Sequence, residues 1–261
     1  MILPYDANPG RMEFSERTGL FVCTIRHLHL NGSVVKMSVA VAIENRLRKA
    51  RWGLFGFGQK AIKGEIGYFG LEEWWLSAFS DDERRHIQDR YQPLGATANT
   101  LTSGDISYTS QTVVGFLCTL ASWFSREDDR AIGHKILAKA EELADDSTPI
   151  LDRHFMYQTK LELHYKDRDK PGHLEKAVVA CLQQIELAPQ AREAFKAEYS
   201  AFGNAPLPSH KGYRQLAIVL EKQMKFREAI GVCAQAEKQG WAGDWQHRIE
   251  RCGKKLAKKR A

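Results

Sequence analysis

The stretch "HKGYRQLAIVLEKQMKFREAIGVCAQAEKQG", residues 210–240, decides the fold class that the sequence predicts. Apolar and small residues recur at spacings of three and four through 210–224 and again through 225–240. Because an α-helix turns once in about 3.6 residues, this spacing puts them on one face of each segment. We therefore expect two consecutive helices that pack through these faces as an antiparallel pair.

Similar segments precede and follow this pair. In chain order, the predicted helices are 109–124 and 126–144, 149–166 and 172–189, 210–224 and 225–240, and a closing helix at 244–259. Ser125 marks a tight connection within the first pair, and the acids that follow it suit a helix N-terminus. The first half of 190–209 is compatible with a further helix. From about Thr109 onward we expect the chain to be helical.

The 210–240 pair resembles the tetratricopeptide repeat. The matching residues are Tyr213, Leu216, Ala217 and Leu220 on its first helix and Phe226, Ala229, Cys233 and Ala236 on its second. Small residues at Ala217, Ala229 and Ala236 let two helices approach closely, and larger residues fill the space around them. The other interpretation is a helical bundle in which the alanines reflect core spacing alone.

The resemblance becomes partial in the earlier pairs. Leu174, Ala177, Cys181 and Pro189 stand at the offsets of Phe226, Ala229, Cys233 and Trp241, and the first pair keeps only Ala131 and Ala138. The intervals between the equivalent alanines exceed the about 34 residues of the family's regular array. The predicted fold is therefore mainly α: an irregular tetratricopeptide-like array of antiparallel helix pairs with a small N-terminal α or α+β cap.

The sequence suggests three regions. We expect the N-terminal cap at 1–95, a small and polar linker at 96–108, and the array at 109–261 with a C-terminal capping helix and a basic tail. In the cap, Ser80 followed by Glu83 has the spacing of a helix capping box. Trp74, Trp75 and Phe79 precede that cap and are expected to be buried against the array.

Residues 20–43 allow two secondary structures. Two β-favouring arms flank Asn31-Gly32, which is a strong hairpin signal. The segment from Ser33 to Gly53 also fits a helix with a serine cap and a glycine stop. A hairpin that enters a helix near Glu44 is slightly favoured, and the choice between strand and helix stays open.

The stretch "GLFGFGQKAIKGEIGYFG", residues 53–70, combines six glycines with aromatic rings. Its segment 56–61 fits G-x-G-x-x-A, but no strand precedes it and no alternating strand and helix series follows, so no dinucleotide cofactor is predicted. We expect a folded connector in which the aromatic rings anchor the cap and the glycines allow sharp turns. Those rings are Phe55, Phe57, Tyr68 and Phe69.

Composition and motifs narrow the function classes. No window approaches the roughly 20 apolar residues of a membrane span, and the N-terminus lacks the basic start and apolar core of a secretory signal, so we expect a cytoplasmic protein. Five widely spaced cysteines predict buried free thiols. His27 and His29 lack a third metal ligand, so a solvated pair is favoured over a metal site. No catalytic signature and no cofactor motif occurs. Among enzymes, only one whose catalytic residues follow no recognisable motif is compatible with the sequence.

The resemblance implies a function in protein interaction. Helical repeats of this type present a concave groove, and the first helix of the 210–240 pair would turn Lys211, Arg214, Ile218 and Lys222 toward it. Such a surface is cationic with one apolar position and suits an extended acidic peptide or a carboxylate. The expected activity is that of an adaptor; the partner's identity and the oligomeric state are left open.

A nucleic-acid-binding protein is the alternative. The net charge is +6, and basic residues gather in the tail "KKLAKKR", 254–260, and in a segment that also carries aromatic rings. Phosphate-neutralising charge beside stacking surfaces is typical of nucleic-acid binding. The candidate patch consists of Arg46, Arg48, Lys49, Arg51, Trp52, Lys60 and Lys63.

Overall fold

The computed structural model describes residues 12–15, 20–23, 62–95, 99–200 and 206–258. The chain divides into two compact units, Met1–Lys60 and Ala61–Ala261. Most of the predicted cap 1–95 thus belongs to the first unit, and its last third belongs with the helices of the second.

A short antiparallel hairpin is the described part of the first unit. Strand β1 (Met12–Ser15) pairs with β2 (Leu20–Cys23), with Met12 opposite Cys23 and Ser15 opposite Leu20. Strand β2 is the start of the predicted 20–43 segment, and here it pairs with the residues before it. The remainder of that segment, with Asn31-Gly32 and the His27/His29 pair, lies outside the described residues, so its conformation stays a prediction.

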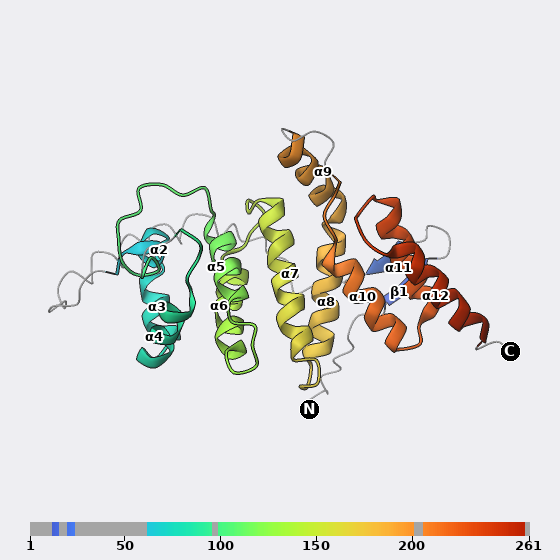
Figure 1. The fold of residues 1–261 in the computed structure, drawn as a ribbon, viewed down its shortest axis with the longest axis horizontal. Helices are drawn as coiled ribbons and strands as arrows, with labels where there is room; N and C mark the ends of the chain where they lie inside the picture. Colours follow the sequence, from blue (N-terminus) through green and yellow to red (C-terminus); the bar gives the residue numbers. More distant parts are fainter. Residues whose placement is uncertain (1–11, 16–19, 24–61, 96–98, 201–205, 259–261) are drawn as a thin grey trace, which may run out of the picture. The chain divides into compact units, whose positions relative to one another are not determined.

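The second unit is helical, which confirms the mainly α fold class (Figure 1). Its described helices are α2 (Gly64–Tyr68), α3 (Glu72–Ala78), α4 (Asp81–Arg90), α5 (Val113–Ser122), α6 (Arg130–Leu143), α7 (Ile150–Lys166), α8 (His173–Glu186), α9 (Ala188–Tyr199), α10 (Lys211–Lys222), α11 (Phe226–Lys238) and α12 (Trp245–Lys258). Helices α5 to α8 and α10 to α12 match the predicted segments, and α9 is the additional helix in 190–209.

Neighbouring helices pack in sequence order. Helix α5 lies against α6, α7 against α8, α10 against α11, and α11 against α12. Successive pairs also touch, because α7 contacts both α5 and α6 and α10 contacts α8. The second unit is therefore an array of consecutive helix pairs, with α9 inserted after α8 and packed on α7.

Side chains cap the first turns of α4 and α5 through hydrogen bonds. Ser80 and Glu83 form the predicted capping box at α4, with the Glu83 amide donating to Ser80 Oγ at 3.2 Å and the Ser80 amide donating to Glu83 Oε2 at 2.9 Å. Thr112 caps α5 by accepting from the Gly115 amide at 3.0 Å. These bonds satisfy amides that have no partner within the helix.

One apolar core joins α2, α3 and α4 to the first helix pair. Trp75 and Phe79 are buried as predicted, and they belong to the same cluster as Phe116 of α5 and Ile136 of α6. Trp74 is half-buried and packs against this cluster. The three short helices therefore cover the apolar face of the α5–α6 pair.

Part of the predicted linker is folded against α2. The Glu65 amide donates to the Thr100 carbonyl at 3.2 Å and the Ile66 amide donates to the Leu101 carbonyl at 3.0 Å. The Leu101 side chain is 1% exposed. Residues 99–104 thus satisfy the first amides of a short helix that has no side-chain cap.

The glycine-rich connector is only partly buried where it is described. Phe69 stacks on Phe116 with ring centroids 5.1 Å apart, as an anchor should. Tyr68 is 43% exposed, so its predicted burial is wrong. In a helix of five residues, Ile66 and Tyr68 point to different sides, and Ile66 takes the buried one. Phe55 and Phe57 lie outside the described residues.

The small residues that allow close packing in α6 differ from the predicted ones. Ala131 and Ala138 are exposed, which corrects the assignment made for the first pair. Gly133 and Ala140 are buried instead, seven residues apart like Ala229 and Ala236. The larger Ile136 and Leu137 determine which face is buried, because alanine costs little when it is exposed.

A buried amide joins the second and third helix pairs. Gln184 of α8 is 0% exposed, and its Nε2 donates to the His154 carbonyl of α7 at 3.1 Å. Its Oε1 accepts from the Gly212 amide at the start of α10 at 2.7 Å. Gln184 stands seven residues after Ala177, at the position that Ala236 occupies in α11. Three helices therefore meet at one side chain.

Two predictions, that the cysteines are buried thiols and that no segment spans a membrane, fall largely within the described residues. Cys118, Cys181, Cys233 and Cys252 are buried free thiols, as predicted, while the side chain of Cys23 lies outside the described part. Burial raises the pKa of Cys118 and of Cys181 to about 12, so these thiols are inert at neutral pH. Among the described helices, none combines the length and apolarity that crossing a bilayer requires.

Replacement of Gly133 by alanine should destabilise the fold, whereas the same change at Gly253 should stabilise it. A β-carbon at Gly133 would lie 2.6 Å from the Phe124 carbonyl oxygen, a backbone atom that cannot rotate away. Such overpacking costs about 1–3 kcal/mol. Gly253 in α12 has open space around it, so Gly253→Ala gains up to about 1 kcal/mol of helix propensity. Urea unfolding followed by circular dichroism measures the change in the free energy of unfolding for each variant. Equal effects of the two substitutions would contradict the close packing of Gly133 against Phe124.

Replacement of Gln184 by leucine should destabilise the protein by about 2–4 kcal/mol. The change leaves the buried Gly212 amide without its acceptor, and an unsatisfied buried donor is costly. Gln183→Leu is the matched control, because the buried Oε1 of Gln183 has no partner among the described residues. Its effect should stay within about 0.5 kcal/mol in the same urea titration.

Candidate functional site: a cationic groove between α10 and α12

The amphipathic pattern of α10 positions the first wall of the site. Tyr213, Leu216, Ala217 and Leu220 are buried, as the 210–240 pattern predicted. The burial of that face leaves Ile218, Glu221 and Lys222 on the side of the helix that faces α12 or the solvent. Each of these three residues lines the groove.

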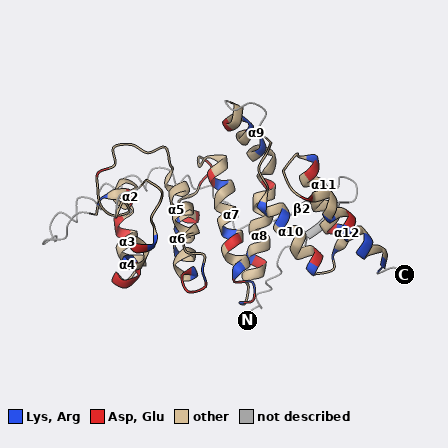
Figure 2. Cartoon of the chain, viewed as in Figure 1, with Lys and Arg blue, Asp and Glu red and all other residues tan. Residues whose placement is uncertain are grey.

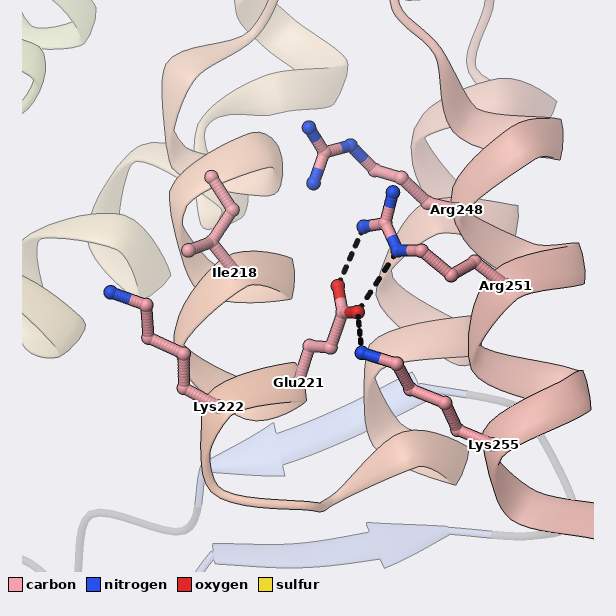
Figure 3. A pocket seen from close by; sticks show the side chains of 6 residues that line it. All are labelled: Ile218, Glu221, Lys222, Arg248, Arg251 and Lys255. Carbon is pink, nitrogen blue, oxygen red and sulfur yellow. Dashed lines mark hydrogen bonds and ion pairs between the residues drawn. The ribbon is translucent and has the colours of Figure 1, made fainter. Parts of the chain in front are cut away.

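Helix α12 supplies the second wall. It begins at Trp245, which is buried and donates its indole N–H to the Trp241 carbonyl at 2.6 Å. Arg248, Arg251 and Lys255 then follow at helical spacing and come to one side. Figure 3 shows this side directed toward α10. In Figure 2 most helices carry both signs of charge, while basic residues gather in the last turns of α12.

The two helices enclose an open groove of about 320 Å³. Its lining consists of Ile218, Glu221, Lys222, Arg248, Arg251 and Lys255. Four of these side chains are cationic, one is a carboxylate and one is apolar. The groove therefore has a net positive charge at neutral pH and an apolar contact in Ile218.

Glu221 ties the two walls together. Arg251 donates from Nε to Glu221 Oε1 at 2.9 Å and from Nη2 to Oε2 at 2.6 Å, a bidentate pair. Lys255 Nζ donates to the same Oε1 at 2.7 Å. The Arg251 hydrogen bonds, assisted by Lys255, lower the pKa of Glu221 to about 2. Glu221 is therefore ionised throughout the physiological range.

Arg248 and Lys222 extend the positive surface beyond this pair. Arg248 donates from Nε to Asp244 Oδ1 at 2.8 Å, and in Figure 3 its guanidinium extends toward Ile218. Lys222 Nζ lies 3.2 Å from the Tyr165 hydroxyl of α7. Within the described part of the chain, no carboxylate lies within ion-pair distance of Lys222. Lys222 can thus bind an added anion, whereas Arg248 is 8% exposed and already paired with Asp244.

The structure places the predicted groove residues in two groups. Ile218 and Lys222 line the groove. Lys211 lies beside α7, with Nζ 3.6 Å from Glu162 Oε1, and Arg214 is exposed outside the lining. The sequence reasoning missed the contribution of α12. Its signal was the spacing of the basic residues in 244–259, which places them on one face of the closing helix.

The alternative nucleic-acid patch lies almost wholly outside the described residues. Lys63 is its described member, and its Nζ lies 3.0 Å from Asp105 Oδ1 in an exposed ion pair. The other members lie outside the described residues and stay a prediction: Arg46, Arg48, Lys49, Arg51, Trp52 and Lys60.

Comparison with protein-family models, curated proteins and solved structures gives no match to this chain.

Replacement of Glu221 by glutamine should destabilise the protein by about 1–2 kcal/mol at pH 7, because it removes a bidentate pair and a lysine contact. Folding lowers the pKa of Glu221, so its stabilisation is complete above the ordinary carboxyl pKa and is lost as pH falls toward about 2. The difference between wild type and variant should therefore shrink below about pH 5. Urea titrations at a series of pH values measure this difference.

Glu237→Gln is the matched control for this experiment. Glu237 is exposed on α11, and within the described residues no cation lies within ion-pair distance of it. Its effect should be small at every pH. A destabilisation by Glu221→Gln that does not change with pH would show that the ion pair is not its source.

Proposed function

We propose that this protein is an interaction or adaptor protein whose α10–α12 groove binds an acidic segment of a partner. The observation that carries the proposal is the lining of the groove, in which four cations and one apolar side chain face a single carboxylate. An excess of cations in an open groove attracts anionic ligands and speeds their association.

The arrangement of the helices supports a tetratricopeptide-like role. Helix α10 is the first helix of its pair, and α12 follows α11 as the first helix of the next position. Small residues at Ala229 and Ala236 are buried where α11 packs on its neighbours, as the repeat requires. A groove formed by two first helices corresponds to the ligand surface that such arrays present.

The chemistry of the lining indicates how an acidic segment would bind. Glu221 already engages Arg251, so this internal carboxylate competes with a ligand carboxylate for the same guanidinium. Lys222 offers further N–H donors, and charge-assisted hydrogen bonds of this type are the stronger ones. Ile218 provides contact for an apolar side chain of the ligand. The ligand that fits is a peptide with alternating acidic and apolar residues.

Fluorescence anisotropy with a fluorescein-labelled peptide of interspersed glutamate and leucine tests this proposal, with a glutamine-for-glutamate peptide as the negative probe. The Lys222→Glu and Lys255→Glu variants should each bind the acidic peptide roughly tenfold more weakly, which corresponds to about 1.4 kcal/mol. Lys238→Glu on α11 makes the same change in net charge away from the groove lining. It should leave binding within about twofold of wild type.

Glu221→Gln gives an opposite and more specific result. Removal of the competing carboxylate frees Arg251, so affinity for the acidic peptide should rise severalfold although the fold is less stable. If the charge-reversal variants and the Lys238→Glu control bind alike, the groove is not the binding surface. A labelled single-stranded oligonucleotide at low salt serves as the counter-probe, because binding unaffected by groove substitutions would favour the 46–63 segment.

A further inference from the structure

Three histidines from three consecutive helices converge away from the groove. His134 lies in the second turn of α6, His164 near the end of α7, and His173 is the first residue of α8. One ring nitrogen or equivalent ligand atom from each lies within 4.8 Å of the other two. His164 is buried, and the other two rings are half-buried, so the cluster is reachable from solvent on one side.

The spacing of the ring nitrogens suits a tetrahedral metal. The Nδ1 atoms of His164 and His173 are 3.2 Å apart. Tetrahedral zinc with Zn–N bonds of about 2.0–2.1 Å separates two imidazole nitrogens by about 3.3 Å. The ring centroid of His134 lies 4.7 Å from that of His164 and 5.4 Å from that of His173. Rotation of the His134 side chain would bring its nitrogen to the metal as the third ligand.

Helix packing fixes the positions of these rings. The loop between α7 and α8 ends at Gly172, whose φ of 75° is a left-handed conformation that glycine adopts readily. That turn brings His164 and His173 opposite each other. His134 reaches the same place from α6, which packs against α7.

Asp167 supplies the outer partner that metal-binding histidines usually have. Its carboxylate is buried, with Oδ2 2.9 Å from His134 Nε2, and it also pairs with Arg130. Lys170 Nζ lies 2.9 Å from Asp167 Oδ1. A carboxylate that accepts from a ligating imidazole fixes the ring's orientation and tautomer. Asp167 thus acts as a positioning residue, and the three rings supply the ligand atoms.

The ligand atoms of the cluster select among cations. All three residues offer imidazole nitrogens, which bind transition metals well. Lys160 and Lys176 add positive charge near His164 that opposes every divalent cation alike, so selectivity comes from the ligand atoms. A set of imidazole nitrogens disfavours Ca²⁺ and Mg²⁺, which need oxygen ligands. Cations that bond strongly to imidazole are the ones that fit.

We infer that His134, His164 and His173 form a binding site for Zn²⁺ or a similar nitrogen-preferring divalent cation, with a fourth position open to water or an added ligand. Three protein ligands with an open fourth position are a recognised zinc arrangement. The bound ion would link α6, α7 and α8. The ordinary alternative is a metal-free network in which His164 and His173 share a hydrogen bond.

Isothermal titration of metal-free protein with zinc chloride, and optical titration with Co²⁺ as the spectroscopic probe, test the inference. We expect one Zn²⁺ per chain at this site, a tetrahedral Co²⁺ spectrum that Zn²⁺ displaces, and a Tm that rises with zinc concentration. His173→Gln should weaken zinc binding at least tenfold and abolish the Co²⁺ spectrum. Mg²⁺ and Ca²⁺ in excess should not compete.

Two controls make the result specific. His247→Gln removes an exposed histidine from α12, and the double variant His27→Gln/His29→Gln removes the pair near the N-terminus; both should keep the site. Circular dichroism checks that His173→Gln is folded, which is expected because this partly exposed ring lies at a helix start. Zinc binding unchanged by His173→Gln, binding lost only with His27 and His29, or no binding to the folded wild type would each overturn the inference.

Discussion

The arrangement of the helical unit depends on the buried amide of Gln184. After α8, helix α9 intervenes before α10 begins. Gln184 restores the contact by binding His154 of α7 and the first turn of α10 with one side chain. A buried amide has four directional hydrogen-bonding positions, so it fixes the relative placement of three helices in a way that apolar packing does not. Gly212 fits this contact, since a β-carbon there would lie 2.8 Å from Gln184 Oε1.

The groove follows from that placement. Helix α10 is held at its start by Gln184 and at its last turn by Glu221, which engages Arg251 and Lys255 of α12. Polar contacts therefore hold the start of α10 against the preceding helix pair and its last turn against α12. The cations of α12 remain together, despite their mutual repulsion, because Glu221 compensates part of their charge. Because one carboxylate cannot balance all of these cations, a net positive charge remains in the groove, and an acidic ligand would be attracted to it.

The sequence predicted what depends on local pattern. Helical periodicity gave the helices from α5 to α12, the Ser80 signal gave the capping box, and cysteine spacing gave the buried thiols. It misplaced the small residues of α6, because alanine is tolerated on either face of a helix. The contribution of α12 to the groove and the meeting of the three histidines depend on which helices are neighbours. Residues 134, 164 and 173 have no metal-binding spacing in the sequence, since three different helices carry them.

Polar contacts at opposite ends hold the α7–α8 pair in the array. At one end, Asp167 binds Arg130 and His134 of α6, beside the histidine cluster. At the other end, Gln184 bonds to the His154 carbonyl of α7 and accepts from the Gly212 amide at the start of α10. Between them the pair packs through small residues such as Ala177 and Ala180, which permit close approach but tolerate sliding. Directional bonds at both ends remove that freedom, so an ion held by the three histidines would strengthen a junction that the fold already fixes by hydrogen bonds. The unequal connections between the helix pairs are thus compensated by specific polar contacts at the two junctions.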